Sequence, residues 1–271
     1  MKCELYRDNF QNFGRYDIPK AQLVIADIPY NIGNFAYGSN PQWYVDGDNK
    51  NGESQLAGKS FFSTDENFHI AEFWAFCNRM LIKEPKERGK APAMICFCSF
   101  QQMAGMIELG DKYGFKNSYP LVFIKNFSSQ VLKANMKIVG ATEYALVFYR
   151  DKLPKFNGGG QMVFNWFNWV KDGKEIPKIH PTQKPIALLK RLIEIFTDVG
   201  DVVIDPVAGS GTTLRAAYEL NREAYGFEVD GRFYEKATKE MLTNMSVDLL
   251  NGSQKTARQL KAEKYKQGSL L

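Results

Sequence analysis

The sequence predicts an α/β fold in which a mostly parallel sheet carries helices on both faces. Short strand-like runs alternate with amphipathic helical segments along most of the chain, which is typical of such sheets. The clearest strands are Leu23–Asp27 and Val202–Asp205, and each ends at an aspartate that a turn follows. Because ligands in open α/β sheets bind where parallel strands end, both turns are candidate parts of one functional site.

The other elements follow from the spacing of apolar residues. We expect helices over 67–83, 101–113, 185–197, 212–220 and 231–245, and strands over 93–99, 119–125, 143–150 and 224–227. The strands at 119–125 and 143–150 are interpreted as an antiparallel hairpin at one edge of the sheet. The basic segment 126–142 between them is expected to be irregular.

The domain organisation is expected to be simple. Residues 1–245 are expected to form a single domain, and 246–271 a polar C-terminal tail. Residues 34–66, which are rich in Asn, Gly, Ser and Asp, form a long loop that is expected to be mobile. Residues 151–178 contain three consecutive glycines and an aromatic cluster.

Composition bounds the class of protein. The 271 residues are 44% hydrophobic and 24% charged, which are ordinary values for a globular domain. The chain shows no apolar run of membrane-spanning length and no signal peptide, so we expect a cytoplasmic location, in a bacterium or in the host of a phage. Four cysteines and two histidines lack the spacing of a metal site, which predicts reduced thiols and no metal.

Charge is distributed unevenly along the chain. The net charge is +5, but residues 112–191 carry 14 lysines and arginines against 4 acidic residues. Such a basic middle third indicates a polyanionic partner such as nucleic acid. The alternative interpretation is a solvated lysine-rich surface.

The turn after Asp205 has the composition of a ligand-binding turn. It reads Asp-Pro-Val-Ala-Gly-Ser-Gly-Thr-Thr-Leu, in which small residues let the backbone approach a ligand before a helix begins. No lysine follows Gly211, which excludes a phosphate-binding P-loop, and Leu214 takes the third glycine position of a dinucleotide motif. Glu228, 17 residues after Gly211, is placed to accept hydrogen bonds from both ribose hydroxyls of a nucleoside. Nicotinamide cofactors and S-adenosylmethionine both fit, and a plain strand–helix turn is the alternative.

The turn Asp27-Ile-Pro-Tyr30 offers groups that suit an extruded base. Such a base needs acceptors for its amino hydrogens and an aromatic face on which to stack. Asp27 supplies a carboxylate, Tyr30 supplies a ring, and Pro29 restricts the residue whose carbonyl is the second acceptor. As an amine is alkylated it gains positive charge, so Asp27 would stabilise the transition state more than the ground state. The alternative is an ordinary strand end with a capping aspartate.

Together these motifs resemble the amino-methyltransferases of DNA. Asp27-Ile-Pro-Tyr30 is similar to their Asp-Pro-Pro-Tyr catalytic motif, and the turn after Asp205 to their Asp-Pro-Phe-x-Gly-Ser-Gly-Thr-Thr cofactor motif. His180-Pro-Thr-Gln-Lys-Pro185 resembles the segment that helps enclose the methionine part of the cofactor. The catalytic motif comes first, which is the order of the beta group. The resemblance implies a Rossmann-like class I methyltransferase with a seven-stranded sheet and one antiparallel strand.

The resemblance also implies a site-specific DNA adenine methyltransferase. It would transfer the methyl group of S-adenosylmethionine, without a metal, to the amino group of a flipped-out adenine. The implied catalytic residues are Asp27, Ile28, Pro29 and Tyr30. The implied cofactor-binding residues are Asp8, near the adenine, Asp27, His180, Thr182, Lys184, Asp205, Pro206, Ala208, Gly209, Ser210, Gly211, Thr212, Thr213 and Glu228.

Two positions depart from the family pattern. Ile28 replaces the first proline, which is expected to loosen the turn, and Val207 replaces a phenylalanine, which is expected to weaken packing on the cofactor. We therefore expect activity with modest cofactor affinity. The preference for adenine rests on Asp27, because relatives that act on cytosine more often carry serine there.

DNA contacts are expected from the basic middle of the chain. The candidates are Lys125, Ser128, Lys133, Asn135, Lys137, Trp166 and Trp169. The two tryptophans are candidate wedges or stacking groups, with a place in the core as the alternative. Residues 151–178 occupy the position of the target-recognition segment, whose shortness suggests either a small recognition surface or a homodimer. A cognate restriction endonuclease is a candidate partner.

Three other interpretations stay open at this point. The first is a methyltransferase for RNA or for a protein amide, but such families favour asparagine in place of Asp27. The second is a catalytically silent DNA-binding subunit, which Ile28 and Val207 would suit. The third, a nicotinamide dehydrogenase, lacks the third glycine and does not explain Asp27-Ile-Pro-Tyr30.

Overall fold

The structure is a computed structural model that describes residues 1–29, 68–127, 130–133, 137–180, 182–243 and 245. In these ranges the sheet strands are β1 (Cys3–Tyr6), β2 (Leu23–Asp27), β3 (Ala93–Cys98), β4 (Asn117–Lys125), β7 (Thr142–Tyr149), β8 (Trp166–Trp169), β9 (Val202–Asp205) and β10 (Glu223–Phe227). The helices are α1 (Ile70–Met80), α2 (Met103–Lys112), α3 (Ile186–Phe196), α4 (Thr212–Glu219) and α5 (Gly231–Lys236), with short helical turns η1 (Phe10–Arg15), η4 (Phe100–Gln102) and η6 (Ala237–Met241). The expected loop 34–66 and tail 246–271 lie outside the described residues.

The strands pair in the order β1-β10-β9-β2-β3-β7-β4-β8. Every neighbouring pair is parallel except β3–β7 and β7–β4, so β7 alone runs against the other described strands of this sheet. The predicted fold class, mostly parallel with one antiparallel strand, is therefore confirmed. The number of strands differs from the expected seven, because Trp166–Trp169 adds β8 beside β4.

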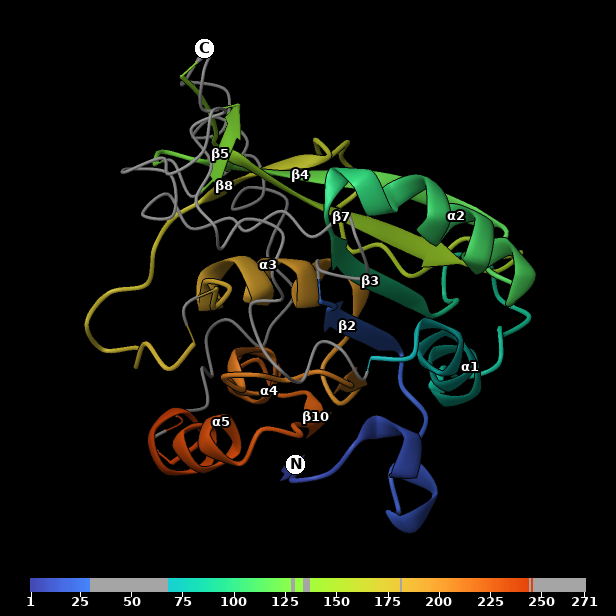
Figure 1. Ribbon diagram of the computed structural model, residues 1–271. Coiled ribbons are helices and arrows are strands. Elements are labelled where there is room, and N and C mark those ends of the chain that lie inside the picture. The colour runs from blue at the N-terminus through green and yellow to red at the C-terminus, as the bar shows by residue number, and fades with distance from the viewer. Residues whose placement is uncertain (30–67, 128–129, 134–136, 181, 244, 246–271) are drawn as a thin grey trace.

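Helices cover both faces of this sheet, as Figure 1 shows. Successive strand side chains point to opposite faces, so Ile25 packs on the side of α3 and α4 while Val24 and Ala26 pack on the side of α1 and α2. The amphipathic pattern of 185–197 correctly predicted α3, whose Leu192 and Ile193 are fully buried. The hydrophobic cores on the two faces of the sheet hold the strand ends in fixed positions.

Two predictions about the chain between residues 119 and 150 need correction. The antiparallel pair is β4 and β7, but β8 is the edge strand, so the pair does not lie at the edge. The segment 126–142 is not wholly irregular, because β5 (Gln130–Lys133) and β6 (Ile138–Gly140) form a two-stranded antiparallel ribbon. Among the described residues, β5 and β6 form a sheet separate from the main one, so the burial pattern that marks core strands in a sequence does not mark them.

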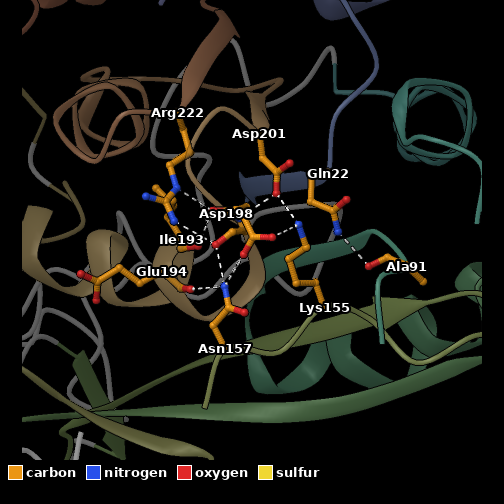
Figure 2. Close-up of polar contacts among 10 residues, drawn as sticks. Gln22, Ala91, Lys155, Asn157, Ile193, Glu194, Asp198, Asp201 and Arg222 are labelled. Carbon is orange, nitrogen blue, oxygen red and sulfur yellow. Dashed lines mark hydrogen bonds and ion pairs between the residues drawn. The ribbon is translucent and has the colours of Figure 1, made fainter. Parts of the chain in front are cut away.

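A polar cluster lies near the amino ends of β2 and β9 and holds the start of segment 151–178 (Figure 2). The Lys155 ammonium lies 2.8 Å from carboxylate oxygens of both Asp198 and Asp201. The Asn157 amide and the Arg222 guanidinium donate to backbone carbonyls at the end of α3. These bonds fix residues 155–157 to the body of the sheet, at the edge opposite the carboxyl ends of β2 and β9.

The described part of the chain includes no helix that is long and apolar enough to cross a bilayer. The cysteines are free thiols, and burial raises the pKa of the Cys98 thiol to about 12. Cys96 and Cys98 share one face of β3, as their spacing predicted.

Candidate active site at the carboxyl ends of the parallel strands

Four carboxylates follow four adjacent parallel strands. Asp8 lies just beyond β1, Glu228 follows β10, Asp205 ends β9 and Asp27 ends β2. Neighbouring strands are about 4.8 Å apart, so the row from Asp8 to Asp27 spans roughly 14 Å. Parallel strands bring all four to the same edge of the sheet. The structure therefore places together the acids that the sequence predicted.

The boundary between β9 and β2, the last two strands of this row, is the point where the chain reverses its direction of winding. From β2 the chain crosses to β3 on one side, and from β9 it crosses to β10 on the other. Since β2 and β9 are neighbours, Asp27 and Asp205 flank the switch point between the two halves. Open α/β sheets bind ligands in the crevice at such a point.

The glycine turn between β9 and α4 leaves room for a ligand. Gly209 and Gly211 have φ of 52° and 76°, in the left-handed region that favours glycine. A Cβ built on Gly209 would meet no described atom within 4 Å, so its backbone borders open space. Helix α4 begins at Thr212, and the Ser210 and Thr212 hydroxyls lie 3.2 Å apart.

Glu228 is tied to this turn by its carboxylate. Its two oxygens accept the backbone N–H groups of Gly209 at 2.8 Å and Asp230 at 2.7 Å. Burial raises the pKa of Glu228 to about 7. A carboxylate has about four acceptor positions, so Glu228 keeps capacity for two further donors such as ribose hydroxyls.

Asp205 and Asp8 are held in different ways. Burial raises the pKa of Asp205 to about 7, although its oxygen accepts the Val207 N–H at 3.0 Å. Burial alone would raise the pKa of Asp8. Hydrogen bonds from Asn12 and Tyr16 outweigh burial and place the pKa of Asp8 below its ordinary value. Asp8 is therefore ionised at neutral pH, while Asp205 changes charge near it.

The Asp27 turn is held from two sides. The Ile28 side chain is 1% exposed and packs into the core on the side of α1 and α2. The Gln102 amide, at the end of η4, donates to the Pro29 carbonyl at 3.0 Å. These contacts fix the backbone at Ile28, which stands in place of the first proline of the Asp-Pro-Pro-Tyr motif. Tyr30 lies outside the described residues.

Lys184, from the segment before α3, reaches the Asp27 carboxylate. Its ammonium lies 2.5 Å from Asp27 Oδ2 and 3.4 Å from Glu143 Oε2. In the same segment, burial and the charge of Lys184 lower the pKa of His180 to about 4, so its ring is neutral at pH 7. His180 Nδ1 lies 2.9 Å from the Thr182 hydroxyl. The segment predicted to enclose the cofactor thus lies against the Asp27 turn.

A family model described as DNA methylase, covering the amino-methyltransferases that act at N6 and N4, matches residues 21–239, which is most of the chain. The chain belongs to the DNA methylase family. This membership confirms the resemblance seen in the three motifs.

Individual relatives of the chain agree with the family. It is 31% identical over 158 residues to the type II methyltransferase M.MjaI of Methanocaldococcus jannaschii, in a match covering 49% of this chain and 52% of the relative. It is 30% identical over 260 residues to the DNA adenine methyltransferase YhdJ of Escherichia coli, covering 89% of this chain and 82% of the relative. The chain thus spans about half the length of M.MjaI in its match.

Solved structures show the same fold. The complex of M1.HpyAVI with SAM matches with a TM-score of 0.63 at 22% identity, covering 88% of this chain and 98% of the other. The cytosine-N4-specific PvuII DNA methyltransferase matches with a TM-score of 0.64 at 15% identity, covering 92% and 89%. At these identities the likeness shows the fold of the DNA methylase and not its target base.

Two predicted DNA contacts of the DNA methylase are corrected by the structure. Lys125 is 6% exposed and its ammonium pairs with the Glu143 carboxylate, so it is not a surface contact for phosphate. Trp169 is also 6% exposed and packs in the core on the side of α3. Trp166 is half-buried and its ring stacks on Phe164 with centroids 5.9 Å apart.

The remaining predicted DNA contacts are only partly described. Lys137 is exposed and directly precedes β6 in the ribbon, and its backbone φ is 54°. Lys133 lies on β5, but its side chain is outside the description, as are Ser128 and Asn135.

Sequence reasoning missed two residues of the site. Glu143 reaches Lys184 from β7, and Gln102 holds the Pro29 carbonyl from η4. The sequence feature that could have identified Glu143 is its carboxylate at the start of an otherwise apolar strand. Nothing in the residues around Gln102 marks it, because its partner is distant in sequence.

Proposed function

We propose that this DNA methylase transfers the methyl group of S-adenosylmethionine to the exocyclic amino group of an adenine that is flipped out of DNA. The observation that carries the proposal is the position of Asp27 at the switch point, at the end of the row of acids. The adenine specificity named for YhdJ and the SAM complex of M1.HpyAVI support it by analogy.

The residues of the row fit S-adenosylmethionine. The row of roughly 14 Å suits an extended ligand with adenine at Asp8, ribose at Glu228 and the methionine part at Asp205. The open space beside Gly209 lets the ligand approach the backbone, and Glu228 retains acceptor capacity for both ribose hydroxyls. When bound, the cofactor supplies an electrophilic methyl group at its sulfonium centre.

The chain's own groups act on the acceptor amine. Asp27 accepts a hydrogen bond from the amino group, and the Ile28 carbonyl, fixed by the buried Ile28 side chain, is the proposed second acceptor. Positive charge develops on the nitrogen as the new bond forms, so the Asp27 carboxylate stabilises the transition state more than the ground state. The nitrogen then loses a proton. Tyr30 is proposed to stack on the base.

Cytosine N4 is the second candidate acceptor. The family model covers N4 enzymes, and the PvuII methyltransferase, which shares the fold, is specific for cytosine N4. Identification of the methylated nucleoside decides between them. Tritium from labelled S-adenosylmethionine should appear in N6-methyladenine after digestion of mixed-sequence DNA to nucleosides. Label in N4-methylcytosine would overturn adenine specificity but leave DNA methylation intact, whereas transfer only to RNA would overturn both.

The DNA-contacting surface is proposed to include the ribbon at Lys137 and the outer face of Trp166, with 151–178 as a short target-recognition insert within one catalytic domain spanning 1–245. A homodimer and a cognate restriction endonuclease are proposed partners, as type II methyltransferase relatives suggest.

Phosphate contacts predict that DNA binding weakens with salt. With roughly four contacts, the dissociation constant should rise by about two orders of magnitude between about 50 and 200 mM salt. Fluorescence anisotropy on a labelled duplex measures this. The Lys137→Gln variant should reduce the slope by about one, while Lys112→Gln on α2 should not change it; a flat wild-type response would remove the proposed surface.

A further inference from the structure

Four ionisable side chains meet beneath the Asp27 turn, and they come from four parts of the fold. Asp27 ends β2, Lys184 precedes α3, Glu143 lies on β7 and Lys125 ends β4. Lys184 contacts both carboxylates, and Lys125 pairs with Glu143. The side chains of Lys125 and Lys184 are only 4% and 6% exposed. Two cations and two anions therefore balance in a buried chain of contacts.

Aromatic rings enclose the two ammonium groups. The Lys125 ammonium lies 4.5 Å from the centre of the Trp169 ring, and the Lys184 ammonium lies 5.7 Å from the same ring and 5.0 Å from Phe97. Cations over aromatic faces are stabilised most where water is excluded. Trp169 belongs to β8, so the cluster joins the catalytic turn to the edge strand that segment 151–178 contributes.

The charges of this cluster depend on each other. Burial lowers the pKa of Lys184, but the carboxylates of Asp27 and Glu143 outweigh burial and raise it above its ordinary value. Burial raises the pKa of Glu143, but Lys184 and Lys125 outweigh burial and lower it. Among the described residues, the charged or titratable groups that interact with Lys184 include Asp27 on β2, Glu143 on β7, Lys125 on β4, Asp205 on β9 and His180 in the preceding segment.

We propose that Glu143 is a positioning residue that holds the Lys184 ammonium against Asp27, with Lys125 balancing the charge of Glu143 from its other side, and so keeps the catalytic carboxylate ionised and in its reactive orientation. This inference rests on methyl transfer by the proposed site, but not on which base accepts the methyl group. A buried ion cluster adds little net stability relative to apolar packing, because desolvation opposes the attraction. The cluster instead fixes the direction of the Asp27 carboxylate, which must accept a hydrogen bond from the amine as the new bond forms.

The proposal predicts a change in the pH profile of Glu143→Gln. Without the Glu143 charge, Lys184 faces Asp27 alone and is repelled by Lys125, so its pKa falls. We expect kcat to fall about tenfold at pH 7 and the alkaline limb of the kcat profile to move to lower pH by about one unit or more. Affinity for S-adenosylhomocysteine, measured by calorimetry at pH 7, should stay within about threefold of wild type.

Three further variants separate positioning from structural damage. Glu143→Asp keeps the charge and should recover the wild-type alkaline limb. In the double variant Glu143→Gln with Lys125→Gln, removal of the repelling cation should return the limb toward wild type. Glu219→Gln removes a buried carboxylate that pairs with Lys190 between α3 and α4, and should leave the profile unchanged.

Total tritium incorporated into DNA is the readout, so the result does not depend on the methylated base. A Glu143→Gln profile with the wild-type alkaline limb, or an equal loss in Glu219→Gln, would overturn the proposal. A shifted limb that Glu143→Asp and the double variant recover would support it, even if the product were N4-methylcytosine and the adenine proposal failed.

Discussion

Asp27→Asn is expected to lower kcat for methyl transfer by about 10²- to 10³-fold. Asparagine keeps the size of the side chain and one acceptor oxygen, but it loses the negative charge that faces the developing positive charge on the amine. It also loses the ion pair with Lys184. Since the row of acids that is proposed to hold the cofactor is otherwise intact, affinity for S-adenosylhomocysteine should fall by no more than about tenfold.

Single-turnover transfer of tritium to duplex DNA measures this effect directly. Asp111→Asn is a suitable control, because that exposed aspartate lies near the end of α2, outside the proposed cofactor and DNA sites. Thermal unfolding should show that both variants are folded. Transfer by Asp27→Asn at the wild-type rate would remove Asp27 from the mechanism.

Glu228→Gln is expected to weaken cofactor binding by about 10- to 100-fold, because hydrogen bonds to charged groups are worth about 1.5–3 kcal/mol. Glutamine has one acceptor oxygen where the carboxylate has two. Both carboxylate oxygens already accept backbone N–H groups, from Gly209 and Asp230, so the amide would leave one of these donors unpaired. The turn and the ribose site would therefore be disturbed together.

The same carboxylate predicts how cofactor affinity depends on pH. Burial raises the pKa of Glu228 from 4.5 to about 7, so below that pH the carboxyl is largely protonated in the free protein. Ribose hydroxyls donate most strongly to the ionised form, so the dissociation constant should rise as pH falls, by up to about tenfold per pH unit. Glu228→Gln should lack this contribution to the pH dependence.

Calorimetric titration of S-adenosylhomocysteine between about pH 5.5 and 8.5 tests both expectations. Glu223→Gln, at the opposite end of β10, is the matched control and should keep the wild-type affinity and its pH dependence. A Glu228→Gln variant that binds like wild type would show that the ribose is held elsewhere.

The sequence was most informative where function depends on the ends of regular elements. A buried apolar run with a terminal acid predicts both a strand and the edge at which its carboxylate emerges, because parallel strands end together. Asp27, Asp205 and Glu228 were placed correctly on this basis. The glycine turn was equally predictable, since positive φ at Gly209 and Gly211 restricts the residue type.

The sequence was least informative where a polar or aromatic residue could point either into the core or out to the surface. Lys125 and Trp169 occur in a basic, aromatic part of the chain, and their composition is typical of a DNA surface. The register of β8 against β4 places Trp169 opposite Lys125 and turns both toward α3 and the core. Because side chains alternate across a strand, a register of β8 shifted by one residue would have turned Trp169 to the opposite face of the sheet, away from Lys125.

The sequence by itself determined the family, the parallel sheet and three of the acids at its carboxyl edge, Asp27, Asp205 and Glu228, because these depend on local patterns within single elements. Tertiary structure alone decided that Lys184 meets Asp27, that Glu143 and Lys125 stand behind it, and that β8 closes the edge. Each of these contacts joins residues far apart in the chain. Their energies come from burial and charge balance, which exist only after the sheet has assembled.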